Sequence, residues 1–461
     1  MTRVHFIGIG GSGLSAIARL LLESGYTVTG SDRVLSPFAA HLQAAGATVH
    51  IGHDAAYVAG ADWVVRSSAI PDDNPEVRAA AKAGIPVYKR ADFLGQMMAE
   101  KTGIAVAGTH GKTTTTAMIA WTLFALHRDP SFIVGGVLNN LGVNARAGKG
   151  SAFVIEADEY DRMFLGLKPR IEVITNVEHD HPDCYPTFAD ILAAFEAFVD
   201  LLPADGALVA CAEDPAAVSL LTRARRDGRN VVAYGIQGER TIASPHWFTA
   251  RGLKPNAHGG FSFQALSNLR MTQPLEVALR VPGEHNVRNA LAVLAVIALL
   301  GLPLAEAAEA LSRYRGAGRR FEVRGEAEGV TIIDDYAHHP TEIRATLAAA
   351  RTRYPGRRVW AVWQPHTYSR TQALFAEFTQ AFADADQVII TEVYAAREPK
   401  QEFTAAEVVS SMRHPSAHFI AGLSEVSHYL LDHLRRGDVL IVLSAGDADQ
   451  VSAQVLAGLE K

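Results

Sequence analysis

The chain has 461 residues, a formal net charge of −6, 48% hydrophobic residues and 20% charged residues. A chain of that length is typical of about three domains, and this composition allows each an ordinary hydrophobic core. The negative net charge predicts no basic surface, so we expect no nucleic acid among its partners. The two cysteines, Cys184 and Cys211, favour a reducing compartment over a disulfide scaffold.

The apolar stretches are too short to cross a membrane. The most apolar one, residues 290–300, ends at Gly301, whereas a membrane span needs about twenty residues. The first residues already read as a strand, which predicts that no signal peptide is present. We therefore expect a cytoplasmic protein with no membrane partner.

Strand-like runs alternate with alanine-rich helical segments over residues 1–100, which predicts a Rossmann-like domain with a mostly parallel sheet. The runs lie at residues 4–9, 27–30, 48–51, 63–66 and 87–88. After the first run come Gly8, Gly10 and Gly13, and Asp32 follows about twenty positions later, as in a dinucleotide fingerprint. This pattern indicates a pyrophosphate-bearing nucleotide, but not necessarily NAD.

The most specific motif follows a strand-like run that begins at Ile104. Residues 108–116 read Gly-Thr-His-Gly-Lys-Thr-Thr-Thr-Thr, which is a glycine turn, a lysine and the threonines that open a helix. Backbone N–H groups and the helix dipole at such a helix start attract phosphate oxygens. Lys112 would reach the β- and γ-phosphates, and the Thr113 hydroxyl would bind Mg²⁺. Although Val106 stands where the general motif has its first glycine, the segment predicts a nucleoside triphosphate site.

Residues 101–316 predict a second α/β domain, with further runs at 132–134, 153–155 and 173–175 and a strand-rich excursion over 236–280. Open α/β sheets bind ligands at the carboxyl ends of their strands. Glu156 lies at one such end, in an acidic segment whose carboxylates would repel one another without a cation. Glu156 is therefore expected to be a second Mg²⁺ ligand.

Two more polar segments lie in this domain. Zinc bound through His179 and His181 is one reading, but no further Cys or His nearby completes a set of four ligands, so a role of His181 beside Mg²⁺ and phosphate fits better. Asn286 and Asn289, three positions apart at the start of an apolar helix, are predicted to share one helix face.

A linker rich in glycine and arginine, residues 315–320, precedes a third α/β domain over residues 317–461. Its strand-like runs lie at residues 331–334, 359–362, 388–391, 417–420 and 439–443. Histidine-rich segments end two of them, at residues 334–340 and 364–370. Because Gly316 and Gly318 tolerate large backbone changes, we expect the third domain to be open without nucleotide and to close on ATP.

Together these motifs resemble the Mur ligase family, the ATP-dependent amino acid ligases of peptidoglycan synthesis. The resemblance covers the whole chain in order. Gly108–Thr114 is similar to the family's ATP loop, in which the missing first glycine is usual, and residues 7–15, 67–71, 334–340 and 364–370 are similar to further family segments. It implies a Rossmann-like N-terminal domain, a central P-loop ATPase domain with a mixed sheet, and a Rossmann-like C-terminal domain.

The resemblance also implies a reaction. The expected one joins L-alanine to the lactyl carboxylate of UDP-N-acetylmuramate through an acyl phosphate, with ATP and Mg²⁺, in a monomer or weak homodimer. The alternative is a recycling ligase that attaches a tripeptide to the same nucleotide sugar, and residues 364–370 favour the first. An oxidoreductase would leave the ATP loop unexplained, and a non-catalytic ATP switch would leave the UDP-type pocket unexplained.

Residue roles follow from the same resemblance. ATP binding is expected of Gly108, Thr109, His110, Gly111, Lys112, Thr113 and Thr114. Binding of the UDP substrate is expected of Gly10, Gly11, Ser12, Gly13, Ser31, Asp32, Ser68 and His110. Mg²⁺ is expected at Thr113, Glu156 and His181, and catalysis at Lys112, His181, Asn286, Asn289, Arg320 and Asp335. Several relatives carry a carbamylated lysine near the metal; here no lysine lies between Lys168 and Lys254, and Glu196 is the candidate substitute.

Overall fold

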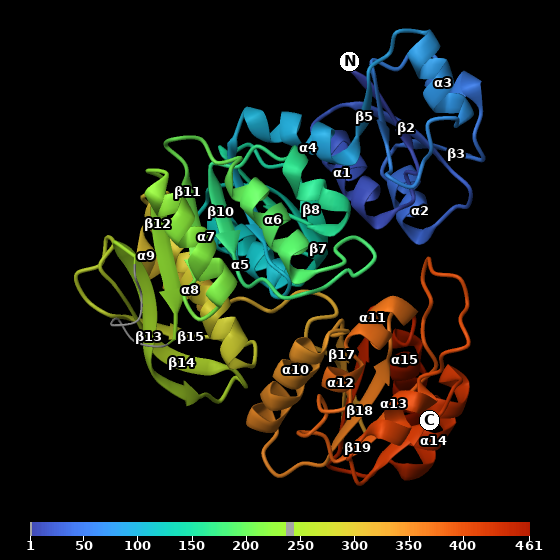
Figure 1. Cartoon of the computed structure of the whole chain (residues 1–461), viewed down its shortest axis with the longest axis vertical. Coiled ribbons are helices and arrows are strands. Elements are labelled where there is room, and N and C mark those ends of the chain that lie inside the picture. The colour runs from blue at the N-terminus through green and yellow to red at the C-terminus, as the bar shows by residue number, and fades with distance from the viewer. Residues whose placement is uncertain (1, 237–243) are drawn as a thin grey trace.

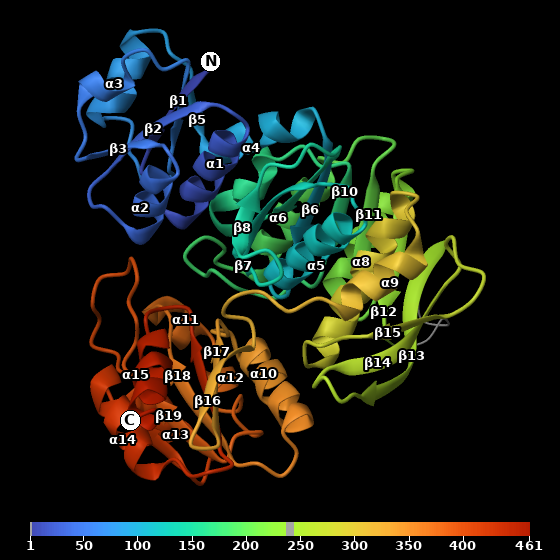
Figure 2. The ribbon, with the colours of Figure 1, turned by 180° about the vertical axis from the view of Figure 1, so that it is seen from behind.

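The computed structural model describes residues 2–236 and 244–461, which form three lobes that follow one another along the chain (Figure 1). Each lobe is built on its own sheet, and in both views the third lobe lies below the first lobe and beside the lower part of the central lobe (Figures 1 and 2). Within the described ranges, no helix is long and apolar enough to cross a membrane. The predicted α/β class with three sheet-containing domains is confirmed.

The first lobe holds a five-stranded parallel sheet in the order β3-β2-β1-β4-β5. Val4 and Phe6 of β1 are fully buried and pack with Ile17 and Leu21 of α1, as expected for a Rossmann-like layer. The elements are β1 (Arg3–Ile7), α1 (Ser12–Glu23), β2 (Thr27–Asp32), α2 (Pro37–Ala44), β3 (Thr48–Ile51), the 3₁₀ helix η1 (Ala55–Val58), β4 (Trp63–Arg66), α3 (Pro75–Lys82), β5 (Val87–Lys89) and α4 (Arg90–Ala99).

The central lobe contains a ten-stranded mixed sheet in the order β15-β14-β13-β12-β11-β10-β6-β9-β7-β8. Its elements are β6 (Thr102–Ala107), α5 (Lys112–Ala125), β7 (Ser131–Leu138), β8 (Val143–Arg146), β9 (Ala152–Glu156), η2 (Tyr160–Gly166), β10 (Ile171–Ile174), α6 (Phe188–Val199), β11 (Ala207–Cys211), α7 (Pro215–Arg226), β12 (Asn230–Gly235), β13 (His246–Pro255), β14 (Phe261–Ser267), β15 (Leu275–Ala278), α8 (Glu284–Leu299) and α9 (Leu304–Ser312). The excursion predicted over residues 236–280 is antiparallel β13, β14 and β15, although residues 237–243 lie outside the described ranges.

Both faces of the central sheet are covered, which explains the unbroken apolar run of β6. Ile104 and Val106 face the core shared with α5 and α8, whereas Ala105 and Ala107 face the core shared with α6 and α7. Strands buried on both faces lose the polar alternation of a half-exposed strand. The position of β6 beside β9 and β10 then places the ends of all three strands at one edge, next to the start of α5.

The third lobe holds a six-stranded sheet in the order β16-β17-β21-β18-β19-β20. Its edge strand β16 is antiparallel to β17 and was not predicted; charged Glu322, Arg324 and Glu326 alternate along it. The elements are β16 (Glu322–Ala327), β17 (Val330–Asp335), α10 (Pro340–Arg353), β18 (Val359–Gln364), α11 (Tyr368–Ala373), α12 (Phe375–Phe378), β19 (Gln387–Ile390), α13 (Ala406–Ser411), β20 (Ala417–Phe419), α14 (Leu423–His433), β21 (Val439–Ser444) and α15 (Asp449–Leu459).

The linker between the central and third lobes runs along β7. The Gly318 N–H donates to the Val137 carbonyl (2.8 Å) and the Asn139 N–H donates to the Gly316 carbonyl (3.1 Å). Gly316 has a φ of +90°, a backbone conformation that other residues adopt at a cost. A hinge movement at this linker would have to break these two backbone bonds.

Candidate active site

A cavity of about 600 Å³ lies where the carboxyl edge of the central sheet faces the third lobe. Most residues expected to bind ATP, to bind Mg²⁺ or to act in catalysis line this one cavity: Thr109, His110, Gly111, Lys112, Thr113, Thr114, Glu156, His181, Asn286, Asn289, Arg320 and Asp335. They come from the ATP loop, the ends of β9, β10 and β17, the start of α8 and the linker. Segments far apart in the sequence therefore meet at one site.

The ATP loop spans the end of β6 and the start of α5. Gly108 has a φ of +135°, and a Cβ there would collide with the Thr175 hydroxyl. Gly111 has a φ of +82° and precedes the helix without a side-chain cap. The N–H groups of the first turn of α5 thus face the cavity uncapped, which is the arrangement that binds phosphate.

Lys112 is held by the loop that it follows. Its Nζ donates to the carbonyls of Gly108 (2.6 Å) and Thr109 (3.2 Å) and to Glu159 Oε1 (2.8 Å). Burial alone would lower the pKa of Lys112, but the nearby carboxylates, Glu159 foremost, raise it, so the ammonium stays charged. Burial raises the pKa of Glu159 to about 7 against the attraction of Lys112.

Thr113 and Glu156 place two oxygen ligands side by side. The Thr113 hydroxyl donates to Glu156 Oε1 (3.0 Å), and Glu156 Oε2 accepts the Gly135 N–H (2.7 Å). Arg320 Nη2 donates to the same Thr113 hydroxyl (3.1 Å), so a cationic group already lies beside this oxygen pair. A hydroxyl and a carboxylate next to a phosphate loop fit a hard cation such as Mg²⁺.

His181 lies on the Lys112 side of the cavity. Its Nε2 is 3.8 Å from Glu159 Oε1 and 3.7 Å from Asp180 Oδ2. Burial lowers the pKa of His181, which keeps the imidazole neutral and able to bind a cation. Its ring meets Tyr160 at a centroid distance of 5.1 Å.

Asn286 and Asn289 share a face of α8, because Asn289 Nδ2 donates to Asn286 Oδ1 (3.1 Å). Both are 5% exposed, and Asn286 Nδ2 also donates to the Pro282 carbonyl (2.6 Å). A Cβ at Gly111 would come within 3.2 Å of Asn289 Oδ1. The asparagine pair therefore lies directly against the ATP loop.

Arg320 and Asp335 bring the third lobe to the cavity. Asp335 accepts the Phe321 N–H (2.7 Å) and the Ala337 N–H (2.8 Å), while Arg320 lies over the Tyr336 ring (4.7 Å). Burial raises the pKa of Asp335 to about 6 against the attraction of Arg320. The aspartate thus ties the backbone at Phe321, just after the linker, to the segment that follows β17.

Several polar contacts join the two lobes around this cavity, and the sequence did not predict them. Arg370 Nε donates to Asp180 Oδ1 (2.7 Å), with both side chains only 4% exposed. Thr341 Oγ1 donates to Glu178 Oε2 (2.8 Å). Arg397 Nη2 donates to Asp183 Oδ2 (2.7 Å). Each pair has one member at the end of a predicted strand, but nothing local identifies its partner.

The residues expected to bind the UDP substrate lie in the first lobe, apart from His110. The turn of Gly10, Gly11 and Gly13 follows β1, and the Gly10 N–H donates to Asp32 Oδ2 (2.8 Å). Ser68 is exposed just after β4; the Ser12 side chain lies outside the described part. The Ser31 hydroxyl is fully buried and donates to Glu76 (2.7 Å), so direct contact with UDP would require it to leave that bond.

Glu196 is not positioned to replace a carbamylated lysine. It lies on α6, where its Oε2 pairs with Arg223 Nη1 (3.0 Å), and its side chain is 45% exposed. The cavity is lined by other residues. The pattern of missing lysines suggested this substitute, but α6 presents the glutamate to the Arg223 side chain instead.

Family models match most of the chain in the same order as the three lobes. The Mur ligase family, catalytic domain, matches residues 3–102; the Mur ligase middle domain matches residues 106–297; and the Mur ligase, glutamate ligase domain, matches residues 319–446. The chain belongs to the Mur ligase family. The family predicted from the sequence motifs of this Mur ligase is therefore confirmed.

Its relatives match over nearly their full lengths. UDP-N-acetylmuramate–L-alanine ligase of Renibacterium salmoninarum is 44% identical, covering 99% of this chain and 96% of the relative. The enzyme of the same name from Roseiflexus sp. is 43% identical, covering 99% of each. Among solved structures, UDP-N-acetylmuramate-alanine ligase of Thermotoga maritima aligns with a TM-score of 0.79 at 29% identity, covering 99% of both chains. A murein peptide ligase of Psychrobacter arcticus aligns with a TM-score of 0.71 at 27% identity, covering 100% of this chain and 99% of that one.

Proposed function

We propose that this Mur ligase joins L-alanine to the lactyl carboxylate of UDP-N-acetylmuramate and converts ATP to ADP and phosphate. The names of the full-length relatives support this reaction over tripeptide attachment. The observation that supports it most directly is the single cavity in which the ATP loop, two asparagines and the third lobe meet.

The reaction would proceed in two balanced steps. The lactyl carboxylate attacks the γ-phosphorus of ATP, which forms an acyl phosphate and releases ADP. The alanine amine then attacks the acyl carbon, so that an amide forms and phosphate leaves with loss of one proton. Phosphoryl transfer depends on positioning and charge neutralisation. Lys112, on the ATP loop, and Arg320, which contacts Thr113, are cationic side chains that would neutralise the transferred phosphate.

Magnesium is the cation that this proposal requires. Thr113 and Glu156 would hold it, with His181 as the third candidate ligand in the same cavity. The ion would supply positive charge to the phosphates during transfer. The Arg320 guanidinium contacts the Thr113 hydroxyl. We infer that this arginine moves toward the phosphates when nucleotide and metal bind.

The three lobes would divide the substrates among them. We propose that residues 1–100 bind the UDP group at the turn of Gly10–Gly13, that residues 101–316 bind ATP, and that residues 317–461 complete the site with Arg320 and Asp335. The turn and the ATP loop are both backbone sites at helix starts. The Asp32 carboxylate, which accepts the Gly10 N–H, fixes the first of them.

The test is a product assay with purified protein, ATP and Mg²⁺. We expect one ADP per UDP-N-acetylmuramoyl-L-alanine, identified by mass spectrometry, only when both UDP-N-acetylmuramate and L-alanine are present. A parallel reaction with the tripeptide in place of L-alanine should give little product. Hydrolysis of ATP at the same rate without UDP-N-acetylmuramate, or preference for the tripeptide, would contradict the proposal.

A further inference from the structure

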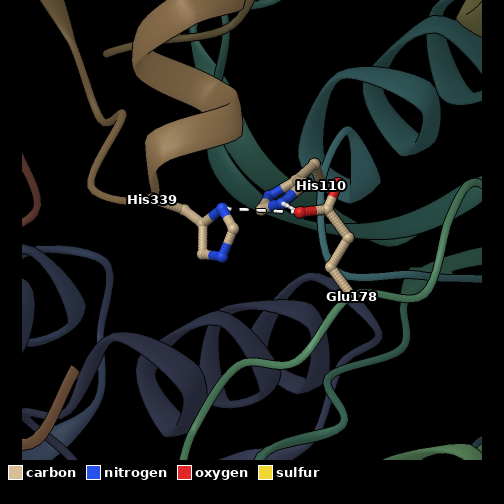
Figure 3. A group of neighbouring side chains, drawn as sticks. All are labelled: His110, Glu178 and His339. Carbon is tan, nitrogen blue, oxygen red and sulfur yellow. Dashed lines mark ion pairs between the residues drawn. The ribbon is translucent and has the colours of Figure 1, made fainter. Parts of the chain in front are cut away.

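A cluster of two histidines and one glutamate lies at the junction of the central and third lobes (Figure 3). His110 belongs to the ATP loop, Glu178 follows β10, and His339 caps the start of α10. One potential ligand atom of each lies within 4.8 Å of the other two. His110 Nε2 is 3.6 Å and His339 Nδ1 is 3.7 Å from the same oxygen, Glu178 Oε2.

The two separations that involve Glu178 are close to those of a tetrahedral metal centre, and the two histidine nitrogens lie within 4.8 Å of each other. Zinc binds imidazole nitrogen and carboxylate oxygen at about 2.0–2.2 Å, so neighbouring ligand atoms lie about 3.4 Å apart. The two distances to Glu178 Oε2 need to shorten by only a few tenths of an ångström. Three protein ligands with water in the fourth position form a common zinc arrangement.

The surroundings of the cluster resemble the outer contacts of a metal site. His110 Nδ1 lies 3.1 Å from Glu342 Oε1, an arrangement that orients the ring and leaves Nε2 directed at Glu178. Thr341 Oγ1 donates to Glu178 Oε2 (2.8 Å) and fixes the carboxylate. Among the described residues, the buried Nε2 atoms of His110 and His339 have no hydrogen-bond partner. For His110 the unbonded nitrogen is the one directed at Glu178, whereas for His339 it is the nitrogen opposite the Nδ1 atom that lies near Glu178.

A bound ion would displace few existing bonds. The Nδ1 atom of His339 accepts only a long bond from the Thr341 N–H (3.3 Å), which caps the start of α10. The ion would take this lone pair, so one long helix-capping bond would be lost.

We propose that His110, Glu178 and His339 form a binding site for a borderline transition-metal ion of the Zn²⁺ class. Two imidazoles and one carboxylate suit such ions better than Mg²⁺, which prefers oxygen. Because His339 is on the third lobe and the other two ligands are on the central lobe, a bound ion fastens the lobes together. It would act as an inhibitory latch on a ligase that must open to release product.

The site is separate from both earlier metal assignments. The proposed Mg²⁺ ligands Thr113 and Glu156 are not members of the cluster. The pair considered from the sequence, His179 and His181, does not form a joint site, because His179 Nε2 lies 2.9 Å from the Tyr185 carbonyl and is engaged there. The signal that the sequence could not supply is the approach of His339 from another domain.

Zinc titration of the full-length protein tests the site. Calorimetry in millimolar Mg²⁺, without substrates, should show one Zn²⁺ per chain. Co²⁺ should give the visible absorption of a tetrahedral centre. Glu178→Gln and His339→Asn should each weaken Zn²⁺ binding at least about tenfold. Asparagine is chosen at position 339 because it can still cap α10. The control His179→Gln should bind Zn²⁺ like the wild-type protein.

The outcomes separate this proposal from the ligase proposal, because binding is measured without any substrate. Loss of Zn²⁺ binding in His179→Gln but not in His339→Asn, or no saturable binding at all, would overturn the site and leave an ion-pair cluster only. In saturating Zn²⁺, a smaller X-ray scattering radius for the wild type than for His339→Asn would support the latch. Equal radii in the two proteins would refute it.

Discussion

Replacing Lys112 with methionine separates the two roles of this side chain. Methionine keeps most of the apolar length but removes the ammonium that contacts two loop carbonyls and Glu159. The loop geometry comes from Gly108, Gly111 and backbone bonds, so the fold should persist. Loss of a charge contact of this kind in the transition state typically lowers the rate by about 10²–10³. We expect that loss in kcat.

The stability effect depends on pH in a way that the Glu159 environment defines. Without Lys112, the fully buried Glu159 carboxyl stays protonated in the folded variant, whereas it ionises above about 7 in the wild type. At position 159 the folded variant therefore keeps a proton that the folded wild type loses above pH 7, whereas the unfolded carboxyl is ionised in both proteins. The Lys112 proton is bound in both the folded and the unfolded wild type, so it cancels. The variant's deficit in unfolding free energy should grow by about 1.4 kcal/mol per pH unit, or about 2 kcal/mol from pH 7 to 8.5.

Urea unfolding at pH 7.0 and 8.5, followed by tryptophan fluorescence, measures this deficit, and Trp121 on α5 reports on the ATP-loop helix. The matched control is Lys112→Met combined with Glu159→Gln, which should lose the pH dependence but remain inactive. A deficit that is equal at the two pH values would refute the role of the buried carboxyl. Activity within tenfold of wild type in a folded Lys112→Met protein would refute the ATP-loop assignment.

Three further predictions concern other charged groups. Glu156→Ala and, to a lesser degree, His181→Ala should raise the Mg²⁺ concentration for half-maximal activity about 10–100-fold, and unchanged Mg²⁺ titrations would contradict the metal assignment. Burial holds the pKa of Glu172 well above its usual range despite Arg229, so wild-type stability should fall as pH rises above about 4.5. At pH 8, Glu172→Gln should therefore have a higher urea midpoint than wild type and an unfolding free energy that is larger by about 1–3 kcal/mol. The two midpoints should be nearly equal at pH 5, and a wild type that is more stable than the variant at pH 8 would refute this. Asp180→Asn should increase the X-ray scattering radius of the ligand-free protein, because it weakens the buried pair with Arg370, and an unchanged radius would show that other contacts hold the lobes.

The strands were predictable because the two sequence signals that mark them, an apolar run and the polar residue after it, are both local. Apolar runs identify β6, β10 and β17, and the polar residues after each run mark the carboxyl edge. The edge strand β16 escaped because its charged residues face solvent on a sheet edge. The order of the ten central strands also lay beyond sequence reasoning, since β13, β14 and β15 extend the sheet from a segment with no clear period.

The candidate site likewise contains residues that local sequence patterns predicted and residues that they did not. The ATP loop was predicted because its function needs only neighbouring residues: a glycine turn, a lysine and a helix start. Glu156, which lines the cavity, was predicted to be a ligand because β9 ends there. By contrast, Arg370 is 190 positions from its partner Asp180, and Glu342 is 232 positions from its partner His110. Only the packing of the two lobes brings these pairs together.

The contacts between the lobes also explain why so many buried charges gather here. Burying a charge is costly unless it is paired, and an uncompensated partner destabilises a protein by about 3–5 kcal/mol. Asp180 and Arg370 are each 4% exposed only because the lobes meet, so opening the cleft would return both to water. The pair then loses attraction but regains hydration, which makes the open and closed arrangements closer in free energy than the short distances suggest. A ligase that must admit three substrates and release three products needs that balance, and polyphosphate, which brings charges of the opposite sign to Lys112 and Arg320, can tip it toward the closed state.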